Sequence, residues 1–302
     1  MRALPTLLAL PFAVIASVAF PIVQEMFLPS PGVVRELVLE SRARPPAEPV
    51  VHRDIVYASR RFGEQRLDIY EPTVAYREGR APVVVFLHGG SWIRGDKITI
   101  RVVDRFLSRM RRAGYFVVAV NYTTSVLQGF EGPLDNTRAA LRWIADHEES
   151  YGYDASNVGL YGVSAGGHLA LMAASDGVPA GIELSLLFIE CAPTDLVALR
   201  EGEAFDSSGM FRLFRRRQLA EMSPIEHVRP DLPPMLVYHG ERDRTVHIRQ
   251  SQRYVEAVRD AGGSATLVRY PEGDHAFLNM TEEQWYEKET RALQFFARHF
   301  SR

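Results

Sequence analysis

The chain has 302 residues, of which 46% are hydrophobic and 24% are charged. These proportions are typical of a globular protein and exclude an intrinsically disordered one. Its 35 basic and 37 acidic side chains give a formal charge of −2, which provides no electrostatic basis for binding nucleic acid.

The N-terminal region has the features of an export leader. Arg2 precedes a nearly uncharged stretch, residues 3–23, in which Ser17, Val18 and Ala19 provide a small-residue cleavage site. The same stretch is close to the ~20 residues that an uncleaved membrane anchor needs. We therefore expect residues 1–23 to be a signal peptide or a membrane anchor. A hydrophobic arm packed on the folded domain is the third alternative.

A signal peptide or an anchor places the folded domain outside the inner membrane, either as a periplasmic or secreted protein or tethered to the membrane. Residues 24–49 include a proline-rich stretch and are expected to form a linker or N-terminal arm.

Residues 50–302 show alternating strand and helix patterns, as expected of one α/β domain. In chain order, the expected strands are 51–58, 66–70, 83–87, 117–121, 158–161, 184–189, 235–239 and 266–270, and the expected helices are 101–113, 134–147, 167–174, 249–261 and 282–299. Short continuous apolar runs suit strands that are buried on both faces, and their alternation with helices predicts a mostly parallel sheet.

Residues 192–234 interrupt this alternation and are expected to form a small insertion beside an apolar pocket. Its apolar residues are expected to line the pocket, and its arginines to be solvated on the outer face of an amphipathic helix. The arginines have two alternative roles, contact with an acidic substrate or with a membrane surface. The apolar residues are Phe205, Met210, Phe211, Leu213 and Phe214, and the arginines are Arg212, Arg215, Arg216 and Arg217.

A Gly-x-Ser-x-Gly motif follows the strand expected at 158–161. Gly162 and Gly166 flank Ser164, and small residues follow at 167–174. A sharp turn from strand to helix would hold the serine in a strained conformation, while the glycines leave room for the turn and for a substrate carbonyl. The motif alone also fits a glycine-rich turn with a capping serine, so its interpretation depends on the other groups present.

Two further residues complete the pattern of an activated serine. The hydroxyl needs a base, and the base needs a carboxylate that fixes its tautomer. Asp243 follows the strand expected at 235–239, and His275 follows the strand expected at 266–270. Both lie beyond the carboxyl ends of strands, where open α/β sheets bind ligands. Asp195, which also follows a strand, is the alternative to Asp243.

A pair of glycines is placed to stabilise an oxyanion. The strand expected at 83–87 ends in the sequence His88-Gly89-Gly90-Ser91-Trp92. Glycines there let backbone N–H groups turn toward a developing negative charge, and the N–H of Ala165, directly after the serine, is a further donor. We expect Gly89, Gly90 and Ala165 to form an oxyanion hole, with His88 bracing its loop.

Together these motifs resemble the α/β-hydrolases of the esterase and lipase group. The resemblance covers residues 50–300 and is narrowest to the feruloyl and acetyl esterase-like branch, which is also similar to kynurenine formamidases. It rests on the chain order serine, aspartate, histidine and on these segments: 88–92, 121–122, 135 with 138–144, 162–166, 193–196, 223–224, 233–234, 240–243 and 273–277. Ser91 and Thr123 depart from the hormone-sensitive-lipase-like branch, which has glycine and arginine there. The resemblance implies an α/β-hydrolase fold with a mostly parallel central sheet, flanking helices and a small lid insertion, residues 192–234, over the acyl pocket.

Other polar residues are expected to be structural. His168 lies on the helix after the serine, His239 ends a strand and is expected to be buried, and Cys191 is expected to behave as a small buried apolar residue. The sequence has no pair of histidine or cysteine ligands, no calcium loop and no Walker or dinucleotide fingerprint. We therefore expect neither a metal nor a cofactor.

These observations predict a serine hydrolase that cleaves small-molecule carboxylic esters through an acyl-enzyme, with no protein partner implied. Trp92 and Tyr122 are expected to lie beside the oxyanion loop, bind substrate and limit the acyl group to a short or compact one. Hydrolysis of a formamide or amide by the same residues is the alternative. A catalytically inactive hydrolase fold used only for binding is a weaker alternative.

Overall fold

The computed structural model describes residues 51–60, 63–76, 80–101, 104–124, 130–203, 210–277 and 279–300. The predicted leader and linker, residues 1–49, lie outside the described residues, as does the candidate lid residue Phe205.

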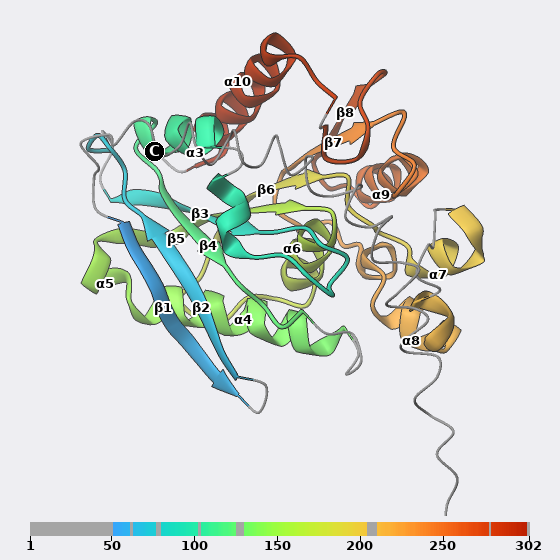
Figure 1. Cartoon of the computed structure of the whole chain (residues 1–302), viewed down its shortest axis with the longest axis horizontal. Coiled ribbons are helices and arrows are strands. Elements are labelled where there is room, and N and C mark those ends of the chain that lie inside the picture. The colour runs from blue at the N-terminus through green and yellow to red at the C-terminus, as the bar shows by residue number, and fades with distance from the viewer. Residues whose placement is uncertain are drawn as a thin grey trace, which may run out of the picture.

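An eight-stranded sheet runs through the domain in the order β1-β2-β4-β3-β5-β6-β7-β8 (Figure 1). β2 is antiparallel to both β1 and β4, and every other pair of neighbours is parallel. The strands are β1 (Val51–Arg60), β2 (Gly63–Tyr70), β3 (Ala81–Leu87), β4 (Phe116–Val120), β5 (Tyr153–Val163), β6 (Leu184–Glu190), β7 (Met235–Gly240) and β8 (Ala265–Tyr270). The predicted α/β class with a mostly parallel sheet is confirmed.

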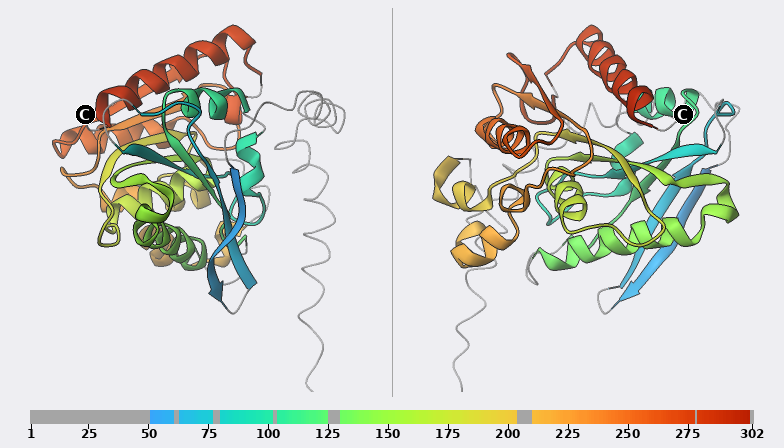
Figure 2. Two further views of the ribbon diagram at one scale, coloured as in Figure 1. Left: turned by 90° about the vertical axis from the view of Figure 1, so that its left-hand side faces the viewer. Right: turned by 180° about the vertical axis from the view of Figure 1, so that it is seen from behind.

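Helices cover both faces of this sheet, as Figures 1 and 2 show. α3 (Asp104–Arg112) and α10 (Glu282–His299) contribute Phe106 and Phe296 to the apolar cluster on one face. α4 (Glu131–Asp146), α6 (Ala165–Ser175) and α9 (Arg249–Asp260) contribute to the cluster on the opposite face. The sheet is therefore the middle layer of three.

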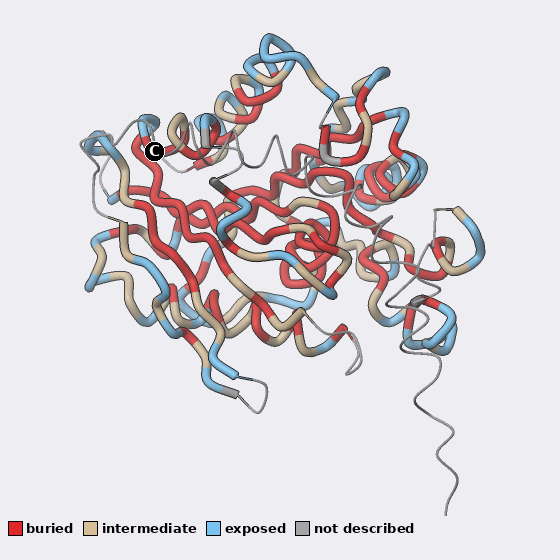
Figure 3. The backbone as a smooth tube through the Cα atoms, viewed as in Figure 1, coloured by how far each residue is buried: buried red, intermediate tan, exposed pale blue. Residues whose placement is uncertain are grey.

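The continuous apolar runs of the sequence follow from this layering. In β3, Val83, Val85 and Leu87 belong to one cluster, whereas Val84 and Phe86 belong to the other. Successive side chains of a strand point to opposite faces, so a strand covered on both faces needs apolar residues at every position. Figure 3 shows the buried backbone concentrated in these central strands.

Element boundaries agree with the predicted ones where the local signal is strong. α10 spans the predicted residues because a capping box starts it: Gln284 N–H donates to Oγ1 of Thr281, and Thr281 N–H donates to the Gln284 side chain. β5 begins at Tyr153, earlier than predicted, because Asp154 and Asn157 interrupt the apolar pattern of its first half. The short helices η1 (Lys97–Arg101) and α5 (Glu148–Tyr151) were not predicted.

The segment between β6 and β7 forms short helices beside the sheet (Figure 1). They are α7 (Leu196–Ala198), the π-helix η3 (Leu199–Glu203), the 3₁₀-helix η4 (Met210–Leu213), α8 (Arg216–Glu221) and the 3₁₀-helix η5 (Pro224–His227). Within the described residues, no helix combines the length and the apolar character that crossing a membrane requires.

Candidate active site

Ser164, His275 and Asp243 form one hydrogen-bonded chain. Nδ1 of His275 donates to Oδ2 of Asp243 over 2.7 Å, and Nε2 of His275 lies 3.0 Å from Oγ of Ser164. The three residues follow β5, β7 and β8, whose carboxyl ends share one edge of the sheet, and all three are buried. Because Nδ1 carries a proton toward the carboxylate, Nε2 is the nitrogen that can accept the serine proton.

Ser164 occupies the turn between β5 and α6 in a left-handed conformation, with φ 52° and ψ −119°. Its N–H donates to the carbonyl of Glu190 on the neighbouring strand, over 2.8 Å. A Cβ on Gly162 would overlap the backbone of Gly166, and one on Gly166 would overlap the carbonyl of Leu87. Both glycines of the motif are thus required by the close approach of α6 to β5 and β3.

The Asp243 carboxylate is held ionised by its surroundings. Burial raises its pKa, but the neighbouring His275 and the hydrogen bonds from His239 and His275 outweigh burial and hold the pKa well below its usual value. Oδ1 accepts from the N–H groups of Thr245 and Val246, at 2.8 and 2.9 Å. These bonds fix the carboxylate in place toward His275.

His239 is a second histidine on this carboxylate. Its Nε2 lies 3.2 Å from Oδ2 of Asp243 and donates to the carbonyl of Val246 over 2.8 Å. Its Nδ1 accepts from the Ser251 hydroxyl over 2.7 Å. The prediction that His239 is buried is confirmed. No sequence signal places it on Asp243, because the contact depends on how the loop after β7 folds back.

His275 has a raised pKa. Burial lowers its pKa, but the side chain of Cys191 and the Asp243 carboxylate outweigh burial and bring the pKa well above its usual value. Cys191 is fully buried, as predicted, and adopts a positive φ of 43° directly after β6. Its position against the histidine is a finding that the sequence did not predict.

Cys191, Asp243 and His275 are also the one group of three potential metal ligands within the described part of the chain. Their ligand atoms lie within 4.8 Å of one another. The hydrogen bond between His275 and Asp243 already occupies one pair of these atoms. A metal bound here would have to displace that bond, so the arrangement fits the hydrogen-bonded chain better than a metal centre.

The loop after β3, residues 88–97, lies beside the nucleophile and is called the oxyanion loop below. A Cβ built on Gly89 would stand 3.5 Å from Cβ of Ser164. Gly90 has a φ of 129°, which favours glycine, and a Cβ there would overlap the carbonyl of Arg94. Ala165 begins α6, so its N–H has no acceptor within the helix. Gly89 and Ala165 thus lie next to Ser164, and Gly90 follows Gly89 in the loop, while the role of their N–H groups as oxyanion donors stays a prediction.

Tyr122 and Asn121 hold the oxyanion loop in place through hydrogen bonds. The Tyr122 hydroxyl donates to the carbonyl of His88 over 2.7 Å, and the two rings stack with centroids 4.2 Å apart. The Asn121 amide donates to Asp96 over 2.9 Å. Nδ1 of His88 donates to the carbonyl of Gly89 over 2.7 Å, in keeping with the expected bracing role. Tyr122 therefore supports the loop, and its role in substrate binding stays a prediction.

Trp92 packs in a buried aromatic cluster. Its ring lies 5.0 Å from that of Phe130 and 6.1 Å from that of Phe211, measured between centroids. Its indole N–H donates to His168 on α6. Trp92 is only 2% exposed, so little of its ring is accessible to an acyl group. Its contact with substrate also stays a prediction.

The lid segment agrees with the sequence in part. Phe211 is buried and Phe214 packs on Phe130 with ring centroids 5.0 Å apart. Leu213 was expected to line the pocket, but this was wrong: it is 71% exposed, because the short helix η4 turns it away from the aromatic cluster. The four arginines, Arg212, Arg215, Arg216 and Arg217, are exposed, as the amphipathic-helix interpretation predicts.

Asp195 does not reach His275. It caps α7, accepting from the N–H of Ala198 over 2.9 Å, and lies 3.5 Å from the guanidinium of Arg253. The structure therefore brings Asp243, and not its rival, to the histidine.

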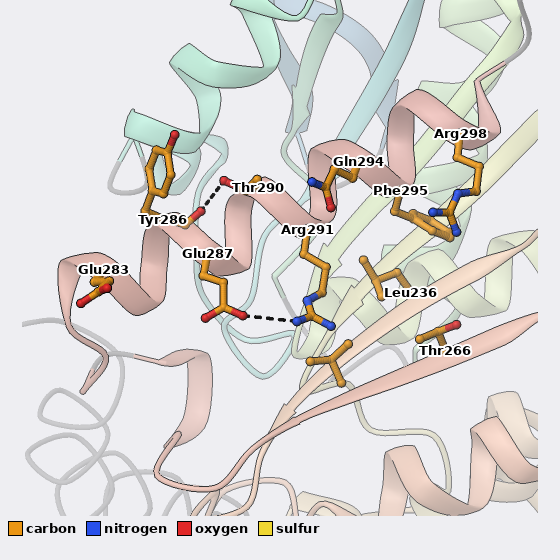
Figure 4. A pocket seen from close by; sticks show the side chains of 11 residues that line it. Leu236, Thr266, Glu283, Tyr286, Glu287, Thr290, Arg291, Gln294, Phe295 and Arg298 are labelled. Carbon is orange, nitrogen blue, oxygen red and sulfur yellow. Dashed lines mark hydrogen bonds and ion pairs between the residues drawn. The ribbon is translucent and has the colours of Figure 1, made fainter.

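A groove of about 610 Å³ lies elsewhere, between α10 and the β7–β8 edge of the sheet (Figure 4). Its labelled residues include Leu236, Phe295 and Arg291, which is paired with Glu287. None of Ser164, Asp243 or His275 lines it, so it does not belong to the catalytic chain.

Comparison with known proteins agrees with this geometry. The BD-FAE family model matches residues 67–258. The chain belongs to the BD-FAE family. The dienelactone hydrolase family model matches residues 220–300, the part that carries Asp243 and His275. The predicted membership of the α/β-hydrolase esterases is confirmed.

Named relatives of this BD-FAE chain are esterases. It is 29% identical over 240 residues to esterase LipQ of Mycobacterium tuberculosis, covering 71% of this chain and 54% of LipQ. It is 25% identical over 253 residues to a probable isoprenylcysteine alpha-carbonyl methylesterase of Arabidopsis thaliana, covering 76% of this chain and 52% of that protein. The chain thus spans about half the length of these curated relatives.

Solved esterase structures share the fold. Esterase B of Lactobacillus rhamnosis superimposes with a TM-score of 0.74 at 22% identity, over 94% of this chain and 96% of that one. The native esterase Est2 of Thermogutta terrifontis has a TM-score of 0.66 at 25% identity, over 83% and 93%. The α/β-hydrolase fold predicted for this chain is therefore confirmed.

Proposed function

We propose that this protein hydrolyses carboxylic esters of small molecules through an acyl-enzyme intermediate. The observation that carries the proposal is the hydrogen-bonded chain from Ser164 through His275 to Asp243. Membership of a family whose named relatives are esterases supports the same conclusion.

In the first half of the reaction, Oγ of Ser164 attacks the ester carbonyl while Nε2 of His275 takes its proton. The Asp243 carboxylate keeps Nδ1 protonated and stabilises the imidazolium that forms. The N–H groups of Gly89, Gly90 and Ala165 stabilise the negative carbonyl oxygen of the tetrahedral intermediate. Collapse of that intermediate breaks the ester C–O bond, and His275 gives its proton to the departing alcohol.

In the second half, a water molecule gives a proton to Nε2 of His275 and attacks the acyl carbon. The same N–H groups hold the second oxyanion, and the carboxylic acid leaves as Ser164 regains its proton. The reaction needs no metal or cofactor.

We also propose that the acyl group is short or compact. The buried cluster of Trp92, Phe130 and Phe211 next to the oxyanion loop supports this, because packed aromatic rings leave little length for an acyl chain.

A serine-directed fluorophosphonate probe tests the central proposal. We expect one covalent adduct on Ser164, located by peptide mass spectrometry, and turnover of acyl esters of 4-nitrophenol. Ser164→Ala is expected to abolish labelling and to lower turnover by several orders of magnitude while the protein stays folded. An Asp274→Asn variant is the matched control, since Asp274 adjoins His275 but its carboxylate accepts from the N–H of Asn279 over 3.4 Å. A wild-type protein that is neither labelled nor active on any ester or formamide would refute the proposal.

We propose further that the protein is exported, with the catalytic domain outside the inner membrane. Arg2 followed by the uncharged residues 3–23 supports this. Fractionation with mass spectrometry of the N-terminus distinguishes a cleaved, soluble form from an anchored one. Full-length protein that begins at Met1 and is free in the cytosol would contradict both.

A further inference from the structure

Lys288 of α10 and Glu190 at the end of β6 form an ion pair that the proposed reaction does not use. Nζ of Lys288 lies 2.5 Å from Oε1 of Glu190, and the two side chains are 2% and 3% exposed. No other pair of a lysine or arginine with a carboxylate in the described segments has both side chains so deeply buried. Desolvating two charges costs free energy that their attraction only roughly offsets, so stability alone is a weak reason for such a pair.

On its lysine side, the pair contacts the loop that carries the base. Nζ of Lys288 lies over the rings of Trp285, Phe277 and Tyr238, at 4.4, 4.8 and 5.6 Å from their centroids. Phe277 is two residues after His275 and has a positive φ of 62°, so the ring that Lys288 contacts belongs to an unusual backbone turn at the end of that loop.

On its glutamate side, the pair contacts the turn that carries the nucleophile. The carbonyl of Glu190 accepts the N–H of Ser164 over 2.8 Å. The Tyr161 hydroxyl donates to the Glu190 carboxylate over 3.5 Å from the strand that leads to the serine. The next residue, Cys191, lies against His275.

We propose that the Lys288–Glu190 pair positions Ser164 and His275 relative to each other. Neither residue touches the reacting atoms, so both are positioning residues, and the inference rests on the proposed function of the site. The ion pair joins α10, which contacts Phe277, to the end of β6, which bonds to Ser164. It fixes the separation of these two elements more sharply than apolar packing, because it has one short optimal distance.

The structure supplies a matched control on the same helix. Glu289, the residue after Lys288, is buried too, but its carboxylate pairs with two arginines of α3, Arg109 over 2.9 Å and Arg105 over 3.4 Å. Lys288→Met and Glu289→Gln each remove one buried charged group of α10 from its ion pairing. Both variants are expected to lower the thermal unfolding midpoint, but only the first should disturb the catalytic geometry.

The test is the second-order rate constant for fluorophosphonate labelling of Ser164, with kcat and KM for a short-chain ester measured in parallel. Displacing reacting groups by a fraction of an ångström to 1 Å costs up to about 100-fold. We expect Lys288→Met to slow labelling and lower kcat by roughly 10- to 100-fold with KM within about twofold, and Glu289→Gln to label within about threefold of wild type.

A double variant, Lys288→Met with Glu190→Gln, separates positioning from stability and serves if the single variant does not fold. It leaves no unpaired buried charge, so its unfolding midpoint should recover toward that of wild type. Labelling should nevertheless stay about tenfold or more below wild type. Labelling that recovers together with the midpoint, or that is equal in Lys288→Met and Glu289→Gln, would overturn the inference. A wild-type protein that is not labelled at all would instead count against the proposed function.

Discussion

The indole N–H of Trp92 donates to Nδ1 of His168 over 3.2 Å, joining the oxyanion loop to the helix that begins after the nucleophile. Nε2 of the same histidine donates to the carbonyl of Met222 over 2.7 Å, which extends the connection to the end of α8 in the lid segment. Because one ring nitrogen accepts and the other donates, His168 has to be neutral. Burial lowers its pKa to about 4, as it does for His88 in the oxyanion loop.

We therefore expect the protein to lose stability in mild acid. The pKa of each histidine is lower in the folded state than in the unfolded state, so the stabilisation is fully present above pH 6.5 and is lost as the pH falls toward 4. A change in pKa from 6.5 to about 4 corresponds to about 3 kcal/mol for each group. Urea unfolding at pH 7.5 and 4.5 measures the loss.

His168→Gln assigns this loss to one residue. The glutamine amide accepts and donates but does not titrate, so the fall in unfolding free energy between the two pH values should be smaller. His247→Gln is the control, because His247 is exposed. An equally steep fall in His168→Gln and wild type would contradict the assignment.

Asp243→Asn is expected to lower ester turnover by about 10,000-fold, the loss known for the same change in a well-studied serine protease, because an amide favours the wrong tautomer of His275. Asp195→Asn keeps a capping side chain and is expected to change turnover by less than about threefold. Steady-state kinetics of both variants provide the comparison. The reverse ranking would make Asp195 the acid of the site.

The rate of ester hydrolysis should rise with pH on the alkaline side of neutrality. The base must be neutral to accept the serine proton, and Cys191 and Asp243 raise the pKa of His275. The profile of kcat/KM against pH is therefore expected to have its midpoint above the usual histidine value. Cys191→Ala should move the midpoint to lower pH, because it removes a neighbour that favours the imidazolium. A midpoint that does not move would show that Cys191 packs against His275 without affecting its pKa.

Acyl selectivity should depend on the aromatic cluster. Wild type is expected to prefer acetyl and butyryl esters, and Phe211→Ala should raise the ratio of octanoyl to acetyl kcat/KM by roughly tenfold, about 1.4 kcal/mol. The ratio does not depend on how much of the variant is folded. Leu213→Ala, at an exposed residue of the same helix, should leave the ratio unchanged. Efficient hydrolysis of palmitoyl esters by wild type would refute the prediction.

The sequence predicted those parts of the site whose signals are local. Ser164, Asp243 and His275 each follow a short apolar run and a turn, and the strand order brings these turns to one edge. The contacts of His239 and Cys191 were not predictable, because each depends on which loop folds against which strand end. Leu213 was wrongly predicted to be buried because hydrophobicity indicates burial, whereas η4 is too short to bury every apolar residue.

The left-handed backbone conformation of Ser164 implies that the active protein has a lower free energy of unfolding than a variant without a side chain at this position. A non-glycine residue at φ 52° and ψ −119° carries roughly 1–3 kcal/mol of strain, which a glycine at the same place would relieve. The inactive variant Ser164→Gly should therefore have a higher thermal unfolding midpoint than the active protein. Selection for thermal stability alone would favour loss of the nucleophile. Any search for more stable variants therefore has to measure ester turnover at every round.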